Sequence, residues 1–461
     1  MTETDRSVPH LPPPPLSACL LSNGRYTVMT RDTGSGFTQW RNRAVTRWRE
    51  DATADMLGSY LFLRDRATGA VWSATPQPLG ASGEVQPMRL VEGRAEYGVC
   101  RESIDATLAV AVAHTFDGDV RRLTIRNERA VDCELDVTSY AELVLGSAAT
   151  DAAHPAFSKL FVETQWWPSP GVIVAGRRPR SPDEPRGWAT HGVAVSPSRE
   201  AVVEYETDRA RFIGRGRSLR DARGLGEPLS QTTGTVLDAI FSARVRLRLA
   251  PGASASVTFC TLAAASPDDL LAACAALASD ADCDRVIAAS GRHEADVCAR
   301  IGIADDERTL FQRCVAPLFV TDPTWRSPPD ALARGAGGAP VLWSNGISGD
   351  RPIVLLHVAE RGDAVAIGQQ HVGQHHVVAA LREQAVAPGD AVAAVDGKGL
   401  GLEAGRDHRR NRGVVLDQQC TPGHPQPFPI SPSAGERGNA SIRPLRRARG
   451  RCARPCRARA C

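Results

Sequence analysis

Short strand patterns fill the first half of the chain and constrain its fold more than any other feature. Within residues 20–261, runs rich in Val, Leu, Ile and Thr are separated by Gly, Pro, Asp or Asn about every 8–12 residues. Residues 243–249 alternate apolar side chains with Arg, which is typical of a strand with one buried and one wet face. About 240 residues of this kind, without a long helical pattern, predict a mainly β fold, a large antiparallel two-sheet sandwich. Pro251 and Gly252 predict the turn of a late hairpin.

The period of the apolar residues changes after residue 265. Ser266 followed by Pro267 predicts a helix start, with the serine as the N-cap and the proline at the first helical position. A second amphipathic segment runs from about residue 284 to residue 319 and is interrupted near Gly302. We therefore expect linker helices over residues 265–340, after the sandwich.

The composition is that of a soluble globular chain, with 42% hydrophobic and 23% charged residues among 461. The net charge of +3 is too small to indicate nucleic acid or an anionic membrane as a partner. There is no apolar run of about 18 residues, so we expect no membrane span. Residues 1–18 are polar and proline-rich, which predicts a flexible lead-in and no secretory signal. The twelve cysteines occur singly, which favours reduced thiols, no metal site and a cytoplasmic location.

The character of the sequence changes at about residue 361. Residues 361–461 contain one aromatic side chain, Phe428, and eight arginines lie between Arg443 and Arg459. Such a segment cannot bury a core, so we expect a disordered tail. One hypothesis is that the reading frame of a GC-rich gene shifts near residue 361. The alternative is a basic tail that binds nucleic acid; we favour the first and expect no nucleic-acid partner.

Residues 46–51 combine an aromatic ring with charged groups, in the order Thr-Arg-Trp-Arg-Glu-Asp. An indole can pack on the C–H face of a sugar, while guanidinium and carboxylate groups pair with the hydroxyls. The sequence therefore predicts Arg47, Trp48, Arg49 and Asp51 as sugar-binding residues, with Trp48 as the stacking platform. The alternative is an arginine–aspartate network that braces a loop over a sheet.

Several longer motifs occur in a fixed order. They are LSNGRY at 21–26, the segment 34–65, VWS at 71–73, TSYAELVL at 138–145, HPAFSKLF at 154–161, ETDRARFIGRGR at 206–217 and WSNGISGDRPIVL at 343–355. Together they resemble the N-terminal domain of family 94 glycoside phosphorylases, formerly glycosyltransferase family 36, and especially the phosphorylase-like region of cyclic β-1,2-glucan synthases. The resemblance implies a galactose-mutarotase-like super-sandwich at 19–264, followed by helices and by the start of a catalytic helical barrel at 341–360.

The resemblance also implies a chemistry. In the family an aspartic acid protonates the leaving oxygen of a β-glucosidic bond while inorganic phosphate, a co-substrate, attacks with inversion. No position of this chain matches that aspartate, so we assign no catalytic residue, expect no other cofactor, and expect the chain to be truncated before the barrel and inactive alone. The implied ligand is a β-glucan or glucooligosaccharide.

Two further expectations follow from the resemblance. The family sandwich makes subunit contacts, which implies a homodimer, and full-length cyclic glucan synthases are anchored in the inner membrane. The alternative interpretations of this chain are a free-standing carbohydrate-binding module and an inert fragment.

Overall fold

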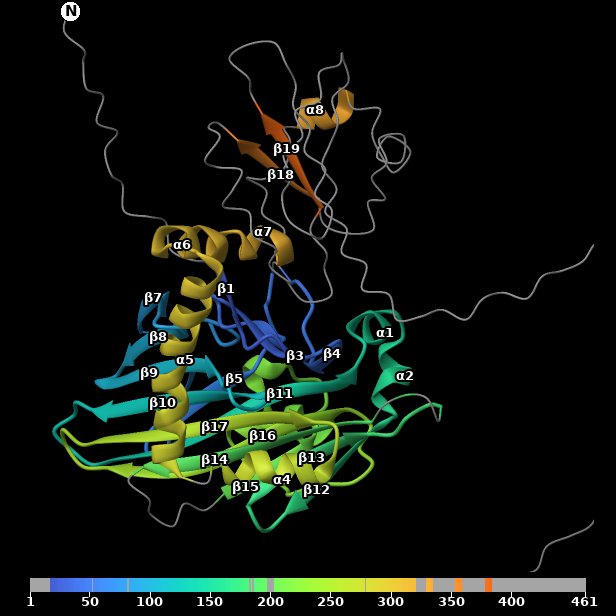
Figure 1. Ribbon diagram of the computed structural model, residues 1–461. Helices are drawn as coiled ribbons and strands as arrows, with labels where there is room; N and C mark the ends of the chain where they lie inside the picture. The colour runs from blue at the N-terminus through green and yellow to red at the C-terminus, as the bar shows by residue number, and fades with distance from the viewer. Residues whose placement is uncertain are drawn as a thin grey trace, which may run out of the picture. The chain divides into compact units, whose positions relative to one another are not determined.

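Two antiparallel sheets packed face to face form the body of the protein (Figure 1). The computed structural model describes residues 17–51, 53–80, 83–181, 184, 186–196, 203–277, 279–320, 329–334, 353–358 and 378–383. The first sheet has nine strands: β1 (Ala18–Ser22), β2 (Tyr26–Arg31), β3 (Gly36–Trp40), β4 (Arg43–Thr46), β5 (Tyr60–Asp65), β6 (Val71–Ser73), β11 (Cys133–Gly146), β15 (Val203–Asp208) and β16 (Ala239–Leu249). Their order is β1-β2-β3-β4-β11-β16-β15, and β5 pairs with both β11 and β6.

The second sheet has eight strands, and all of its pairings are antiparallel. They are β7 (Glu84–Val91), β8 (Arg94–Arg101), β9 (Ile104–Val112), β10 (Gly118–Asn127), β12 (Val162–Trp167), β13 (Val172–Arg177), β14 (Gly187–Ser196) and β17 (Ser254–Ala264). Their order is β12-β13-β14-β17-β10-β9-β8-β7. The predicted mainly β, two-sheet antiparallel sandwich is confirmed.

The turn at Pro251 and Gly252 does not close a hairpin, so that prediction was wrong. β16 pairs with β11 and β15, whereas β17 pairs with β10 and β14, so the turn carries the chain from one sheet to the other. Gly252 has φ +70°, which an L side chain would disfavour. A turn motif fixes a local reversal of the chain, but it does not fix which neighbour each strand pairs with.

The main core lies between the sheets and is built from alternate residues of the strands. Leu135 and Val137 of β11 belong to it together with Val257 and Phe259 of β17, and all four side chains are buried. Burial of apolar surface, at about 25 cal/mol per Å², holds the two sheets together.

His191 of β14 also lies in this core. Its ring stacks between Phe241 and Phe259, with centroid distances of 5.4 and 5.7 Å. Its Nε2 is 2.8 Å from the Ser139 hydroxyl and its Nδ1 is 3.1 Å from the Thr261 hydroxyl, so both ring nitrogens have partners. Burial, assisted by the nearby charge of Arg121, lowers the pKa of His191 from 6.5 to about 3. The imidazole is therefore neutral at physiological pH.

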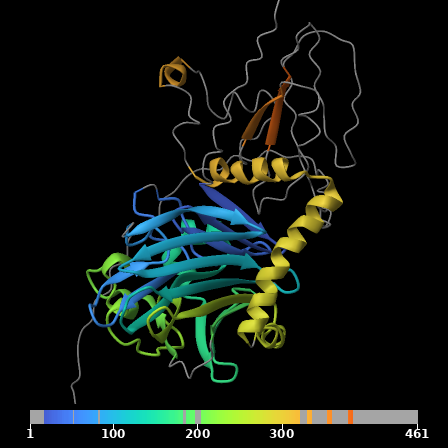
Figure 2. The ribbon, with the colours of Figure 1, turned by 90° about the vertical axis from the view of Figure 1, so that its left-hand side faces the viewer.

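Helices cover the outer faces of both sheets. The structure has α1 (Ala148–Ala153), α2 (Pro155–Lys159), α3 (Arg209–Ile213), η1 (Leu219–Asp221), η2 (Arg223–Leu225), α4 (Pro267–Ala275), α5 (Asp280–Ile301), α6 (Asp305–Arg313), α7 (Val315–Phe319) and α8 (Pro329–Arg334). α3, η1 and η2 pack on the nine-stranded sheet, while α4 and α5 pack on the eight-stranded sheet (Figure 2). In the part of the chain that the structure describes, no helix is long and apolar enough to cross a membrane.

The helix signals in the sequence have their expected counterparts. The Ser266 hydroxyl accepts a hydrogen bond from the Asp269 amide, and Pro267 occupies the first position of α4. α5 ends at Gly302, whose φ of +73° gives a left-handed C-cap. Both predictions, the helix start at Ser266 and the interruption near Gly302, are confirmed.

Several sequence predictions fall largely outside the described residues. Of the predicted lead-in at 1–18, the structure describes residues 17 and 18, and Ala18 already belongs to β1. The predicted barrel start at 341–360 contains one described element, β18 (Ile353–Val358), and the predicted tail contains one, β19 (Val378–Glu383). These two strands pair in parallel. Nothing in the sequence patterns predicts this pairing.

The outer edge of β1 is closed by a side chain of α6. The Gln312 Oε1 accepts a hydrogen bond of 3.0 Å from the Leu20 amide, and the Gln312 Nε2 donates one of 3.1 Å to the Leu20 carbonyl. A single side-chain amide thus takes the place of the next strand. An unpaired edge would present free N–H and C=O groups to other chains, and Gln312 removes this exposure at Leu20.

Replacing Gln312 with alanine should remove both of these hydrogen bonds. We expect a loss of about 1–2 kcal/mol in the free energy of unfolding, because two partly buried backbone groups lose their partner. Amide hydrogen exchange checks the site directly: the Leu20 amide should lose protection. The Leu21 amide faces β2 and should keep its protection, since alternate residues of a strand bond to opposite sides. Equal loss at both amides would instead indicate that β1 as a whole has come loose.

Candidate functional site

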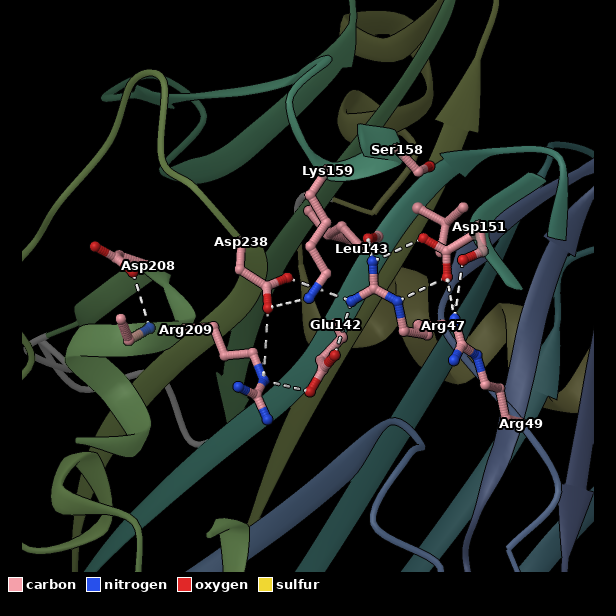
Figure 3. Close-up of polar contacts among 12 residues, drawn as sticks. Arg47, Arg49, Glu142, Leu143, Asp151, Ser158, Lys159, Asp208, Arg209 and Asp238 are labelled. Carbon is pink, nitrogen blue, oxygen red and sulfur yellow. Dashed lines mark hydrogen bonds and ion pairs between the residues drawn. The ribbon is translucent and has the colours of Figure 1, made fainter. Parts of the chain in front are cut away.

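The segment that follows β4 joins a partly buried set of ion pairs at one end of the nine-stranded sheet (Figure 3). We call this set the Arg47 network. Its members are Arg47, Arg49, Glu142, Asp151, Lys159, Arg209 and Asp238. They come from the segment after β4, from β11, α1, α2 and α3, and from the residue that precedes β16. The network therefore joins segments that are far apart in the sequence.

Arg47 is the centre of this network, and its guanidinium uses all of its donors. Nε and Nη2 bind the two oxygens of Asp151 at 2.8 and 3.0 Å, in a bidentate pair. Nη1 bonds to Glu142 at 2.8 Å and to Asp238 at 3.3 Å, and Nη2 also donates to the Leu143 carbonyl at 3.2 Å. A guanidinium has five N–H donors, so none remains for a sugar hydroxyl. Arg47 is 5% exposed, which agrees with a bracing position.

Two further cations bind two of the same carboxylates. Lys159 Nζ bonds to Asp238 at 2.5 Å, and Arg209 Nε bonds to Glu142 at 2.6 Å. The Tyr140 hydroxyl donates to the same oxygen of Glu142 at 2.9 Å. The buried carboxylates of Glu142 and Asp151 and the partly buried one of Asp238 are therefore matched by cations from α2, α3 and the segment after β4.

Burial and pairing act on these groups in opposite directions. Burial alone would raise the pKa of Glu142, but Arg209 and Arg47 outweigh it and hold this pKa below its usual value. Burial alone would lower the pKa of Arg47, but the hydrogen bonds and charge of Asp151 and Glu142 raise it. Both groups are therefore ionised in the folded protein. A carboxyl that is held ionised by two guanidinium groups is unsuited to act as a general acid.

Trp48 is partly buried and packs against other aromatic rings. Its ring lies 5.9 Å from that of Phe37, which in turn lies 5.5 Å from Phe319 of α7. These side chains belong to a small apolar cluster under α7. The Trp48 Nε1 is buried without a hydrogen-bond partner among the described residues. The indole thus packs the helices against β1–β3.

Arg49 and Asp51 lie nearer to solvent. The Arg49 side chain is 44% exposed, and its Nη2 donates to the Asp151 carbonyl at 2.9 Å. Asp51 accepts hydrogen bonds from the Thr53 amide, the Thr53 hydroxyl and the Ala54 amide. These bonds, from Thr53 first, lower the pKa of Asp51 and fix a local turn. Of the four predicted residues, Arg49 is the one whose charged group is most accessible at the network.

Five network residues were not predicted as a site: Glu142, Asp151, Lys159, Arg209 and Asp238. Glu142, Lys159 and Arg209 do lie inside the motifs that carry the family resemblance. The sequence feature that could have revealed the network is the carboxylate of Glu142 inside an otherwise apolar strand pattern, because a charge buried in a strand requires a partner. No group of three or more His, Cys, Asp or Glu side chains that could hold a metal ion occurs within the described ranges.

The two-sheet fold and the motifs agree with the comparison to known families. Residues 6–280 match the family described as glycosyl hydrolase 94, supersandwich domain, and the chain belongs to this family. The resemblance inferred from the sequence motifs is confirmed. The chain is also 34% identical over 346 residues to the cyclic β-(1,2)-glucan synthase NdvB of Rhizobium meliloti (strain 1021). This alignment covers 75% of the chain and 12% of that protein, so the chain spans about an eighth of the length of this relative.

The solved structures that resemble this chain do so only distantly. A bacterial glucoamylase complexed with acarbose has a TM-score of 0.38 at 6% identity, with coverage of 62% of this chain and 37% of that one. A putative kojibiose phosphorylase from the human microbiome has a TM-score of 0.33 at 8% identity, with coverage of 59% of this chain and 34% of that one. A putative aldose 1-epimerase from Escherichia coli K12 has a TM-score of 0.32 at 10% identity, with coverage of 54% of this chain and 100% of that one. Likenesses this distant indicate nothing about function.

Proposed function

We propose that this chain is the carbohydrate-binding sandwich of an enzyme of the cyclic β-1,2-glucan synthase and glycoside phosphorylase type, and that it binds β-1,2-linked glucan. The observation that supports this most strongly is the 34% identity over 346 residues to a cyclic β-(1,2)-glucan synthase. The described residues around the Arg47 network favour binding over catalysis, because Glu142, Asp151 and Asp238 are each paired with cations. The network then serves to hold binding groups in place.

The rim of the network offers the groups that a glucan would contact. Arg49 and Arg209 have 44% and 40% exposed side chains, and each is anchored to a buried carboxylate residue, Asp151 or Glu142. An anchored guanidinium presents its remaining donors in a fixed direction, which suits paired sugar hydroxyls. Among the predicted sugar-binding residues, Arg49 is the one that contacts the glucan. Arg47 and Trp48 act as supports.

Calorimetric titration with β-1,2-glucooligosaccharides tests the proposal. The protein should bind, and Arg49→Ala should weaken the affinity about 10-fold, because a charge-assisted hydrogen bond contributes about 1.5 kcal/mol or more. Arg126→Ala is the matched control: Arg126 lies on β10, is similarly exposed and pairs with Glu128. It should bind as the wild type does. Trp48→Ala is a weaker probe because it also disturbs packing against Phe37.

Two results would count against this function. Absence of measurable binding by the wild-type chain would favour an inert fragment. Equal weakening by Arg49→Ala and Arg126→Ala would show that the glucan does not contact the rim of the Arg47 network.

A further inference from the structure

Three cysteines meet in the apolar layer between the eight-stranded sheet and the helices that cover it. Cys260 lies on β17, Cys274 on α4 and Cys283 in the first turn of α5, and all three are free thiols. The Sγ atoms of Cys260 and Cys283 are 3.8 Å apart, although the residues are separated by 23 positions in the sequence. Two thiols in van der Waals contact, on different elements, need only a small movement to bond.

We propose that Cys260 and Cys283 form a disulfide when the protein meets a peroxide, and that this bond ties α5 to β17. A disulfide has an S–S length of about 2.05 Å, so the sulfurs must approach by somewhat less than 2 Å. Rotation about the Cα–Cβ bonds of the two cysteines moves a sulfur by this order of distance. The proposal is independent of glucan binding.

The surroundings of Cys283 favour it as the attacking thiol. Arg122 on β10 forms ion pairs with Asp280 and Asp284, so a guanidinium lies beside the first turn of α5. The start of a helix also stabilises a negative charge. The hydrogen bond between the two thiols, followed by the charge of Arg122, lowers the pKa of Cys283 against the opposing effects of burial and Asp280, whereas the same hydrogen bond and burial raise the pKa of Cys260. The two thiols thus have different roles, one as nucleophile and one as resolving group.

The reaction balances with hydrogen peroxide as the oxidant. The Cys283 thiolate attacks one peroxide oxygen, the O–O bond breaks, and the other oxygen leaves as water after taking a proton. The sulfenic acid formed on Cys283 is then attacked by the Cys260 sulfur, the S–O bond breaks, and a second water leaves. Two thiols are oxidised by two electrons and one peroxide is reduced to two waters.

Burial sets the pace of this reaction. Cys283 is fully buried and Cys260 is 7% exposed, so a peroxide molecule reaches them through local opening between α5 and the sheet. Once formed, the bond would hold that opening closed. A brief exposure to peroxide would therefore leave α5 covalently attached to β17.

Peptide mapping of the full chain after peroxide treatment tests this inference. Free thiols are alkylated under denaturing conditions, and a linked peptide containing Cys260 and Cys283 should appear and should vanish on reduction with dithiothreitol. The melting temperature should rise by several degrees on oxidation and fall again on reduction. Cys283→Ala should abolish both effects, whereas Cys274→Ala, which removes the neighbouring thiol, should retain them.

The mapping of the wild type decides the matter even if a variant folds poorly. Recovery of Cys260 and Cys283 as alkylated thiols after peroxide treatment would overturn the inference. So would a linked peptide that pairs Cys260 with Cys274.

Discussion

Replacing Arg47 with alanine should lower the free energy of unfolding by about 3–5 kcal/mol, because it leaves buried carboxylates without their central partner. Arg47 bonds to Glu142, Asp151 and Asp238, and it is itself 5% exposed. Urea denaturation measures the effect as a fall in the midpoint with an unchanged slope.

Two further variants sharpen this prediction. Arg47→Lys keeps the charge but has three donors where the site uses five, so we expect an intermediate loss. Arg248→Ala removes an exposed ion pair with Asp132 and should cost about 1 kcal/mol or less. A loss of unfolding free energy for Arg47→Ala that is as small as the loss for Arg248→Ala would contradict a bracing role for the network.

Acid should destabilise the sandwich through His191. The unfolded imidazole takes up a proton near pH 6.5, whereas in the folded protein the pKa of His191 is about 3. The unfolded state therefore binds more protons between these values, and stability falls as the pH falls. The contribution of His191 is fully present above pH 6.5. It is lost at about 1.4 kcal/mol per pH unit, or about 5 kcal/mol in total by pH 3.

Comparison with His191→Gln isolates this contribution from that of other groups. Glutamine keeps polar atoms for Ser139 and Thr261 but does not titrate. The variant should be less stable than the wild type at neutral pH, and the difference should shrink as the pH falls from 6.5 to 3. Unfolding free energies measured at several pH values give the two curves. Parallel curves would show that the core does not exclude the protonated imidazole.

The sandwich could be predicted because strand patterns report local burial. In β16, Arg246 and Arg248 face outward from the sheet and are exposed, as the alternation predicts. Arg244 has the same orientation but is 3% exposed, because it donates to the carbonyl groups of Gly224 and Glu227. The period of a strand identifies its two faces. It does not tell whether another segment covers the outer one.

The candidate site was harder to predict, because its members are brought together by the fold. Arg47 is separated by 95 residues from Glu142 and by 191 from Asp238. The sequence indicated that the charges around Trp48 need partners, and it left open whether these are sugar hydroxyls or carboxylates. For Arg47 the structure supplies protein partners for every donor. For Trp48 it supplies Phe37, on a strand that the sequence could not place beside the helices.

The contact of Gln312 with Leu20 means that the helices after the sandwich share its folding unit. β1 begins the nine-stranded sheet, and the residue that bonds to the outer N–H and C=O groups of Leu20 lies 292 positions later. A chain cut after Gly302 would retain every strand from β1 to β17. It would still expose an unpaired strand edge at Leu20, to which extended segments of other molecules could bind. The boundary of the stable domain therefore lies beyond α6, although the last strand of the sandwich ends at Ala264.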